Sequence, residues 1–272
     1  MKKFILNADD LGKTKAHNDA VLKALEFGLL KSASVLVNGE YFFDAVNRII
    51  TPNPQIGFAL HLNIIEGNAL NPQLNLLCDK KGIFNNNYLS LILKCNSKAF
   101  LAQVEEEFEA QIQKALNYYT PTHIDSHVHT HAIPAIFSIC AKLMKKYGFK
   151  QIRSQTEIPY FVKNKEYNPI NFIKVMLLNY FTRKNQKTIK KYNLTTNDYI
   201  LGVNYTGLMD DRTIIEGLEK INKDSTVEAL IHPCFYENSK KDCHLAEYEL
   251  SINEALKEKI QNLGYLIVNY IN

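Results

Sequence analysis

Four histidines gather in one short stretch of this sequence. Residues 122–134 read THIDSHVHTHAIP and contain four of the chain's eight histidines: His123, His127, His129 and His131. A β-rich run, 122–126, precedes them, and a helical pattern begins at Pro134. In α/β proteins ligands and metals are bound at such junctions, because the loops at the carboxyl ends of the strands share one rim. Since neutral imidazole is the commonest protein ligand for transition metals, the stretch predicts a polar or metal site.

One ion cannot bind all four of these histidines. If the chain stays extended, the odd-numbered positions from 123 to 131 share one face, and a rise of about 3.3 Å per residue puts the outer two roughly 26 Å apart. We therefore expect one metal to take one or two of them. His129 and His131 are expected to orient other ligands or to lie in the loop.

An aspartate pair and two further histidines complete a plausible hydrolytic site. Asp10, His61 and His127 would be the ligands, because a carboxylate and two imidazoles suit a divalent cation, Mg²⁺ or Zn²⁺. Neighbouring side chains on an extended segment point opposite ways, so Asp9 would be free to act as general base on a metal-activated water. His232 is placed to protonate a leaving amine. Together these residues predict hydrolysis of an amide or an ester.

The elements that must position these residues alternate along the chain. Apolar patterning predicts helices at 16–30, 41–50, 97–118, 135–147, 168–192, 211–222 and 247–263. It predicts about eight strands, at 4–7, 33–38, 56–62, 122–126, 149–153, 199–203, 226–231 and 265–269. This alternation indicates one α/β domain over residues 1–272, with a TIM-barrel-related (β/α) barrel that is complete, incomplete or distorted. The long polar stretch 66–88 is expected to be a loop that forms a lid over the mouth.

Polar residues fall at the carboxyl ends of the expected strands. A closed or nearly closed barrel would bring all of them to one mouth, whereas an open doubly wound sheet would gather only some. Taken singly, the aspartate pair could cap a helix and His61 could be a hydrogen-bonded core histidine. Core packing, however, gives no reason why so many polar residues should all fall at strand ends. The set comprises Asp9, Asp10, Asn38, His61, His127, Arg153 and His232.

Two of these strand-end residues are candidate substrate contacts. Asn38 and Arg153 would face the mouth, where Arg153 could hold a substrate carboxylate or hydroxyl. The alternative for Arg153 is an ion pair with Glu157, and the sequence favours neither. We expect His17 and His244 to lie on the surface.

Five motifs resemble the YdjC family of carbohydrate deacetylases. They are NADDLG at 7–12, SASVLVN at 32–38, GFALHLN at 57–63, THIDSHVH at 122–129 and IHP at 231–233, in the family's order. The resemblance implies a barrel-like fold and N-deacetylation of an acetylated amino sugar. It also implies metal ligands at Asp10, His61 and His127, a base at Asp9 and a proton donor at His232. Two departures lie in loops around the mouth: Gly12-Lys13-Thr14 lacks the usual helix-opening residues, and Cys234 follows His232-Pro233 where glycine is common. They bear on the identity of the substrate more than on the reaction.

Charge, cysteine content and the N-terminal sequence indicate where the protein works and which partners it is not expected to bind. A formal charge of +4 is too mild to predict nucleic-acid binding. The five cysteines are widely spaced without a CxxC motif, which indicates free thiols in a reducing compartment. The apolar run in MKKFILNADD is too short for a signal peptide, and no later stretch predicts a membrane span, so we expect a cytoplasmic protein. The family resemblance implies a small sugar as its partner. Whether it forms a homodimer stays open.

Two other functions are compatible with these residues. The first is metal-dependent hydrolysis of a phosphoester or a cyclic amide. Barrels of that kind often carry a His-x-His pair on the first strand, whereas here the first strand carries the aspartate pair. The second is a non-catalytic sugar-binding barrel, which would need neither Asp9 nor the metal ligands.

Overall fold

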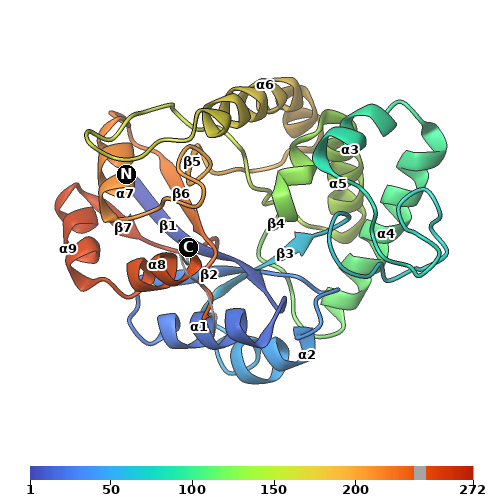
Figure 1. The fold of residues 1–272 in the computed structure, drawn as a ribbon, viewed down its shortest axis with the longest axis horizontal. Helices are drawn as coiled ribbons and strands as arrows, with labels where there is room; N and C mark the ends of the chain where they lie inside the picture. The colour runs from blue at the N-terminus through green and yellow to red at the C-terminus, as the bar shows by residue number, and fades with distance from the viewer. Residues whose placement is uncertain (236–242, 272) are drawn as a thin grey trace.

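The strands form a curled parallel sheet. The computed structural model describes residues 1–235 and 243–271. Within them the strand order is β4-β3-β2-β1-β6-β5, all pairs are parallel, and β7 pairs with the first residues of β1. Helices lie around the outside of this sheet (Figure 1). The strands are β1 (Lys2–Leu11), β2 (Leu30–Val35), β3 (Gly57–Leu62), β4 (Ile124–Ser126), β5 (Tyr199–Leu201), β6 (Thr226–Ile231) and β7 (Tyr265–Ile267).

The segment 150–156 links the two outer strands β4 and β5. Gln151 and Ile152 form single bridges to Thr195 and to Ile124 of β4, and the Ile200 amide of β5 donates to the Thr156 carbonyl at 2.8 Å. The prediction of a regular strand at 149–153 is therefore wrong, because this segment forms only isolated backbone bridges to the chain on either side of it. The prediction of a barrel-like (β/α) fold, distorted at this point, is confirmed.

The helices follow most of the predicted pattern. They are α1 (Lys15–Leu25), α2 (Phe42–Ala45) with the π-helix η1 (Val46–Ile50), α3 (Tyr88–Lys94), α4 (Lys98–Leu116), α5 (Pro134–Tyr147), α6 (Pro169–Tyr192), α7 (Asp211–Glu219), α8 (Cys243–Ser251) and α9 (Glu254–Asn262). The single helix expected at 247–263 is in fact two, because the Asn253 side chain accepts a hydrogen bond from the Leu256 amide and starts α9 afresh. No helix among the described residues is both long and apolar enough to cross a bilayer.

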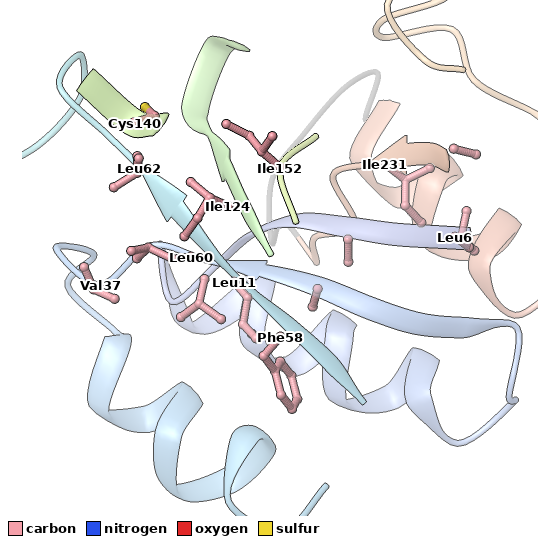
Figure 2. Packing of buried hydrophobic residues seen from close by; sticks show 14 of the residues in the cluster. Leu6, Leu11, Val37, Phe58, Leu60, Leu62, Ile124, Cys140, Ile152 and Ile231 are labelled. Atoms are coloured by element: carbon pink, nitrogen blue, oxygen red, sulfur yellow. The ribbon is translucent and has the colours of Figure 1, made fainter. Parts of the chain in front are cut away.

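Buried aliphatic side chains hold the strands in register. Every residue of β3 is buried, as expected for a strand covered on both faces. Figure 2 shows Leu60 of β3 beside Ile124 of β4, with Ile152 close by. This packing fixes the carboxyl ends of the strands, where the polar residues lie.

The histidine-rich segment leaves the extended conformation after Ser126, where the predicted strand 122–126 also ends. After β4 ends at Ser126, the chain enters the 3₁₀ helix η2 (His127–Ala132). Val128 and His129 take left-handed backbone conformations, with φ of 52° and 57°. The alternative of one shared extended face is thus wrong beyond residue 126. Asp10 also has a positive φ, 68°, and such strained backbone is frequent at functional sites.

Candidate active site

The predicted convergence of strand ends is confirmed for the main candidates. A cavity of about 290 Å³ is lined by Asp9, His61, His127 and His232, which come from four different strands or the residues directly after them. Parallel strands place these ends on one rim, because their carboxyl termini all point the same way. Asp10 joins the group through contacts with two of the histidines.

Asp10, His61 and His127 form a set that fits a metal ion. Oδ1 of Asp10 lies 2.8 Å from Nδ1 of His127 and 3.6 Å from Nε2 of His61, and one ligand atom from each residue lies within 4.8 Å of the others. Ligands at about 2.1 Å from one ion and at right angles to each other lie about 3 Å apart, which matches this spacing. The prediction that these three residues meet is therefore confirmed.

The charges around this set favour a cation. Burial would lower the pKa of His127, but the Asp10 carboxylate, the hydrogen bond to it and a further bond to Glu66 raise that pKa to about 9. The two other close groups of acidic residues and histidines among the described residues share Asp125. There the Arg153 guanidinium already supplies the positive charge, which leaves Asp10, His61 and His127 as the better metal site.

Each of the two candidate ligand histidines, His61 and His127, has a carboxylate beside a ring nitrogen. Nδ1 of His61 lies 2.7 Å from Oδ1 of Asp125, and Nε2 of His127 lies 3.0 Å from Oε2 of Glu66. Such partners fix the tautomer and the ring orientation, so that the other nitrogen can bind a metal. Neither Asp125 nor Glu66 is predicted from the sequence as a partner of these histidines. Glu66 lies only five residues after His61, whereas nothing in the sequence pairs Asp125 with His61.

Asp9 is held by the residue that was predicted to bind substrate. Arg153 donates from Nη1 to Oδ2 of Asp9 at 2.9 Å and from Nη2 to Oδ1 at 2.7 Å, and Asn7 donates to Oδ1 at 2.8 Å. Burial raises the pKa of Asp9, but the adjacent guanidinium outweighs this and holds it below its ordinary value. Asp9 is therefore an ionised, fixed carboxylate at the wall of the cavity.

Arg153 is completely buried, and its guanidinium forms ion pairs with three carboxylates. Besides Asp9, its guanidinium contacts Glu228 at 2.7 Å and Asp125 at 2.7 Å. Glu157, the alternative ion-pair partner, instead accepts hydrogen bonds from the amides of Gly202 and Asn204. This placement favours a role for Arg153 in holding Asp9, rather than the substrate contact or the Glu157 pair considered from the sequence.

His232 is held in its charged form. Its Nδ1 lies 3.3 Å from Oε2 of Glu247 on α8, and its backbone amide donates to the same oxygen. Burial disfavours the imidazolium, but the hydrogen bond and the negative charge of Glu247 raise the pKa of His232 to about 9. An imidazolium that lines the cavity is a competent proton donor.

The remaining sequence candidates lie around the rim or below it. Asn38 donates to the Asn68 carbonyl at 2.9 Å, so its contact with substrate stays a prediction. His131 is buried, with bonds to Ser126 and to the Arg153 carbonyl, as expected of a residue that supports the site. His129 lines the cavity. His17 is 1% exposed, so its prediction as a surface residue is wrong.

The predicted loop 66–88 contributes to the site at both ends. Glu66 contacts His127, and Tyr88, the first residue of α3, lines the cavity. Between them, the amides of Leu70 and Asn71 donate to the buried carboxylate of Glu107 on α4 at 3.0 and 3.2 Å. The loop is thereby attached to the barrel wall beside the mouth, which is compatible with the predicted lid.

Comparisons with known proteins agree with this geometry. A family model described as "YdjC-like protein" matches residues 3–262. A carbohydrate deacetylase of Listeria welshimeri is 30% identical, covering 77% of this chain and 83% of the relative. A chitooligosaccharide deacetylase of Yersinia enterocolitica is 24% identical, covering 99% and 98%. For a carbohydrate deacetylase of Clostridium beijerinckii, 32% identical, the match spans only 58% of the relative and 54% of this chain.

A solved structure shares the fold. It is a proposed cellobiose-phosphate cleavage protein from Enterococcus faecalis, with a TM-score of 0.76, coverage of 99% of this chain and 98% of that one, and 23% sequence identity. At this identity the likeness establishes the barrel-like architecture alone.

Proposed function

The chain belongs to the YdjC-like family, and from this premise we propose that it removes the N-acetyl group from an acetylated amino sugar. The substrate would be an oligosaccharide or glycoconjugate that contains N-acetylglucosamine. The observation that carries the proposal is the meeting of a three-residue metal set with Asp9 and His232 at one cavity. The relatives named carbohydrate and chitooligosaccharide deacetylase support the same class of substrate.

Asp10, His61 and His127 would hold a divalent cation, Mg²⁺ or Zn²⁺. When bound, such an ion polarises the carbonyl under attack and lowers the pKa of water. Asp125 and Glu66 keep the two imidazoles oriented for this task. Three protein donors, rather than four, would suit a catalytic metal site better than a closed structural one.

The two remaining residues divide the proton transfers. Asp9 takes the proton from the attacking water, and Arg153 and Asn7 keep its carboxylate ionised and in place. The Arg153 contact makes Asp9 a weaker base, so its contribution lies in position and charge more than in basicity. His232 gives a proton to the leaving nitrogen, and Glu247 keeps it charged for this step. Acetate and the free amino sugar are the products.

Acetate release tests the proposal directly. The purified protein, loaded with Mg²⁺ or Zn²⁺, is incubated with N-acetylglucosamine, its oligomers, and lipid- or nucleotide-linked derivatives. We expect acetate from at least one member of the panel and loss of activity on chelation. Release of phosphate from a phosphoester panel, without acetate from any sugar, would favour the other hydrolase chemistry. Absence of stoichiometric metal together with sugar binding would favour the non-catalytic barrel.

A further inference from the structure

One wall of the catalytic cavity is made of aliphatic side chains. Leu178, Val203 and Leu230 line it, and each is at most 4% exposed. They belong to a small cluster of buried apolar residues that is separate from the main core. Leu177 on α6 completes this wall. Because the three buried residues are packed against their own cluster, the wall is part of the fixed structure.

This wall is larger than an acetyl group requires. The cavity of about 290 Å³ approaches the volume of pockets that hold whole small molecules, roughly 300–1,000 Å³. The methyl of an acetyl group would cover a small part of it. Aliphatic surface left in water is unfavourable, so a ligand that brings several carbons to this wall is favoured over one that does not.

The apolar surface continues out of the cavity along α6. Ile173 and Ile170 precede Leu177 by four and seven residues, a spacing that places all three on one face of the helix. Ile173 is 65% exposed and Ile170 is 61% exposed. A chain too long for the cavity would therefore meet further apolar side chains at its exit.

Two side chains that line the cavity, Tyr88 and His129, each carry a buried polar atom without a partner in the described part of the chain. The hydroxyl of Tyr88 and Nδ1 of His129 have no hydrogen-bond partner among residues 1–235 and 243–271, and both side chains line the cavity. Buried polar atoms in native proteins are nearly always bonded, so a bound molecule is expected to satisfy them. Sugar hydroxyls or an amide would do so.

We propose that the substrate is an amino sugar that carries an apolar group of several carbons. Resting on the deacetylase function proposed above, this assigns the group to the wall of Leu177, Leu178, Val203 and Leu230, while Tyr88 bonds the polar part. The group has two sources, an N-acyl chain longer than acetyl or an alkyl group on the anomeric oxygen. In either case its burial supplies binding energy that a plain chitooligosaccharide lacks.

Two substrate series separate the sources. The first lengthens the N-acyl group of glucosamine from acetyl to hexanoyl, and the second lengthens the alkyl group of N-acetylglucosaminides from methyl to hexyl. We expect kcat/KM to rise by about two- to fourfold per added methylene in one series, since a buried methylene contributes this much. A rise in the first assigns the acyl chain, and a rise in the second assigns the anomeric group.

Matched variants test whether the wall at Leu177 causes the dependence of kcat/KM on chain length. Leu177→Asn should bring the ratio of kcat/KM for the longest and shortest member close to one. Leu116→Asn, which changes an apolar residue of α4 that is 40% exposed, should leave that ratio as in the wild type. An unchanged ratio in Leu177→Asn would remove the apolar wall from recognition.

Calorimetry with alkyl glucosaminides, which have no amide to cleave, measures the same site without turnover. We expect the affinity to rise with chain length and binding to show a negative heat-capacity change. Hydrolysis of chitooligosaccharides with no dependence on chain length in any assay would overturn this inference and leave the deacetylase function intact. Chain-dependent binding without hydrolysis of any acylated sugar would instead overturn the deacetylase function, and the apolar molecule would be a ligand only.

Discussion

Arg153 holds both carboxylate oxygens of Asp9 with two parallel hydrogen bonds, of 2.9 and 2.7 Å. The same guanidinium contacts Asp125, which in turn bonds His61. The buried guanidinium of Arg153 therefore connects Asp9, the expected base, with Asp125, the partner of the expected metal ligand His61. Asp9 and His61 are thus positioned by one network, so a change at its centre should affect both.

Arg153→Met should destabilise the protein and abolish activity. It leaves the buried carboxylates of Asp9 and Asp125 without their cation, and breaking a buried ion pair in this way costs about 3–5 kcal/mol. Arg153→Lys keeps the charge but lacks the planar fork, so it should recover part of the stability and little turnover. Urea unfolding and acetate release measure the two effects. If Arg153→Met unfolded at the wild-type urea concentration, the network would not stabilise the fold.

Asp10→Ala, His61→Ala and His127→Ala should each weaken metal binding and abolish turnover. Each removes one of three donor atoms that lie within 4.8 Å of one another. Elemental analysis after dialysis against Zn²⁺ or Mg²⁺, with acetate release on the same samples, checks the loss. His123→Ala is a suitable control, because that buried histidine stacks on Tyr270 outside this set. A variant with full metal content and full turnover would show that its residue is not a ligand.

Asp125→Asn should lower metal affinity without removing a ligand. The amide cannot replace the carboxylate that orients His61, and loss of such a partner typically costs 10- to 100-fold in affinity. A competition titration with a chelating dye gives the dissociation constant of the metal. Glu66 is more exposed than Asp125, with 55% of its side chain accessible, so Glu66→Gln should have the smaller effect. Equal affinities in the wild type and Asp125→Asn would limit Asp125 to a structural role.

The sequence predicted the strand ends well because position along a short apolar run is local information. Asp9, His61 and His232 each follow or end such a run, and the fold gathers them at one rim. The partners of these residues could not be predicted in the same way. His61 and Asp125 face each other because β3 and β4 pair in a particular register, and that register depends on packing across the sheet.

The contacts of Arg153 could not be predicted from the sequence either. It stands at an expected strand end, so a place at the mouth was a reasonable prediction. Its side chain instead reaches carboxylates contributed by β1, β4 and β6, which no local pattern links. The predicted end of β4 at Ser126 is confirmed, but the left-handed turn after it could not be predicted, because Val128 and His129 are neither glycine nor asparagine.

Shortening the loop between its anchored ends should affect extended substrates most. Deletion within 72–82 spares Glu66, Tyr88 and the two amides that bond Glu107. If the loop covers the mouth, KM for an oligomer should rise while the metal content stays unchanged. Steady-state kinetics on a monomer and an oligomer make the comparison. Unchanged KM for every substrate would count against a lid.

Substitutions at Asp9 and His232 should separate proton transfer from metal binding. Asp9→Asn should retain metal, because the expected ligand carboxylate belongs to Asp10, and should lose about 10² to 10⁴ in turnover or more. His232→Ala should also retain metal. The loss of turnover in His232→Ala should be smaller on activated esters, because their leaving group needs no proton. Metal analysis and paired assays on amide and ester separate the roles. Loss of metal from Asp9→Asn would make Asp9 a ligand instead.

The pH dependence follows from the charges around each residue. His232 must carry its proton to act as an acid, and Glu247 raises its pKa to about 9, so activity should fall as the pH rises through about 9. Asp9 must be ionised to act as a base, and Arg153 lowers its pKa, so the fall on the acidic side should come below the ordinary range of a carboxyl. Glu247→Gln removes the charge that stabilises the imidazolium and should move the alkaline limb to lower pH. An alkaline limb that stays in place in Glu247→Gln, or an ester defect in His232→Ala as large as the amide defect, would show that His232 is not the proton donor.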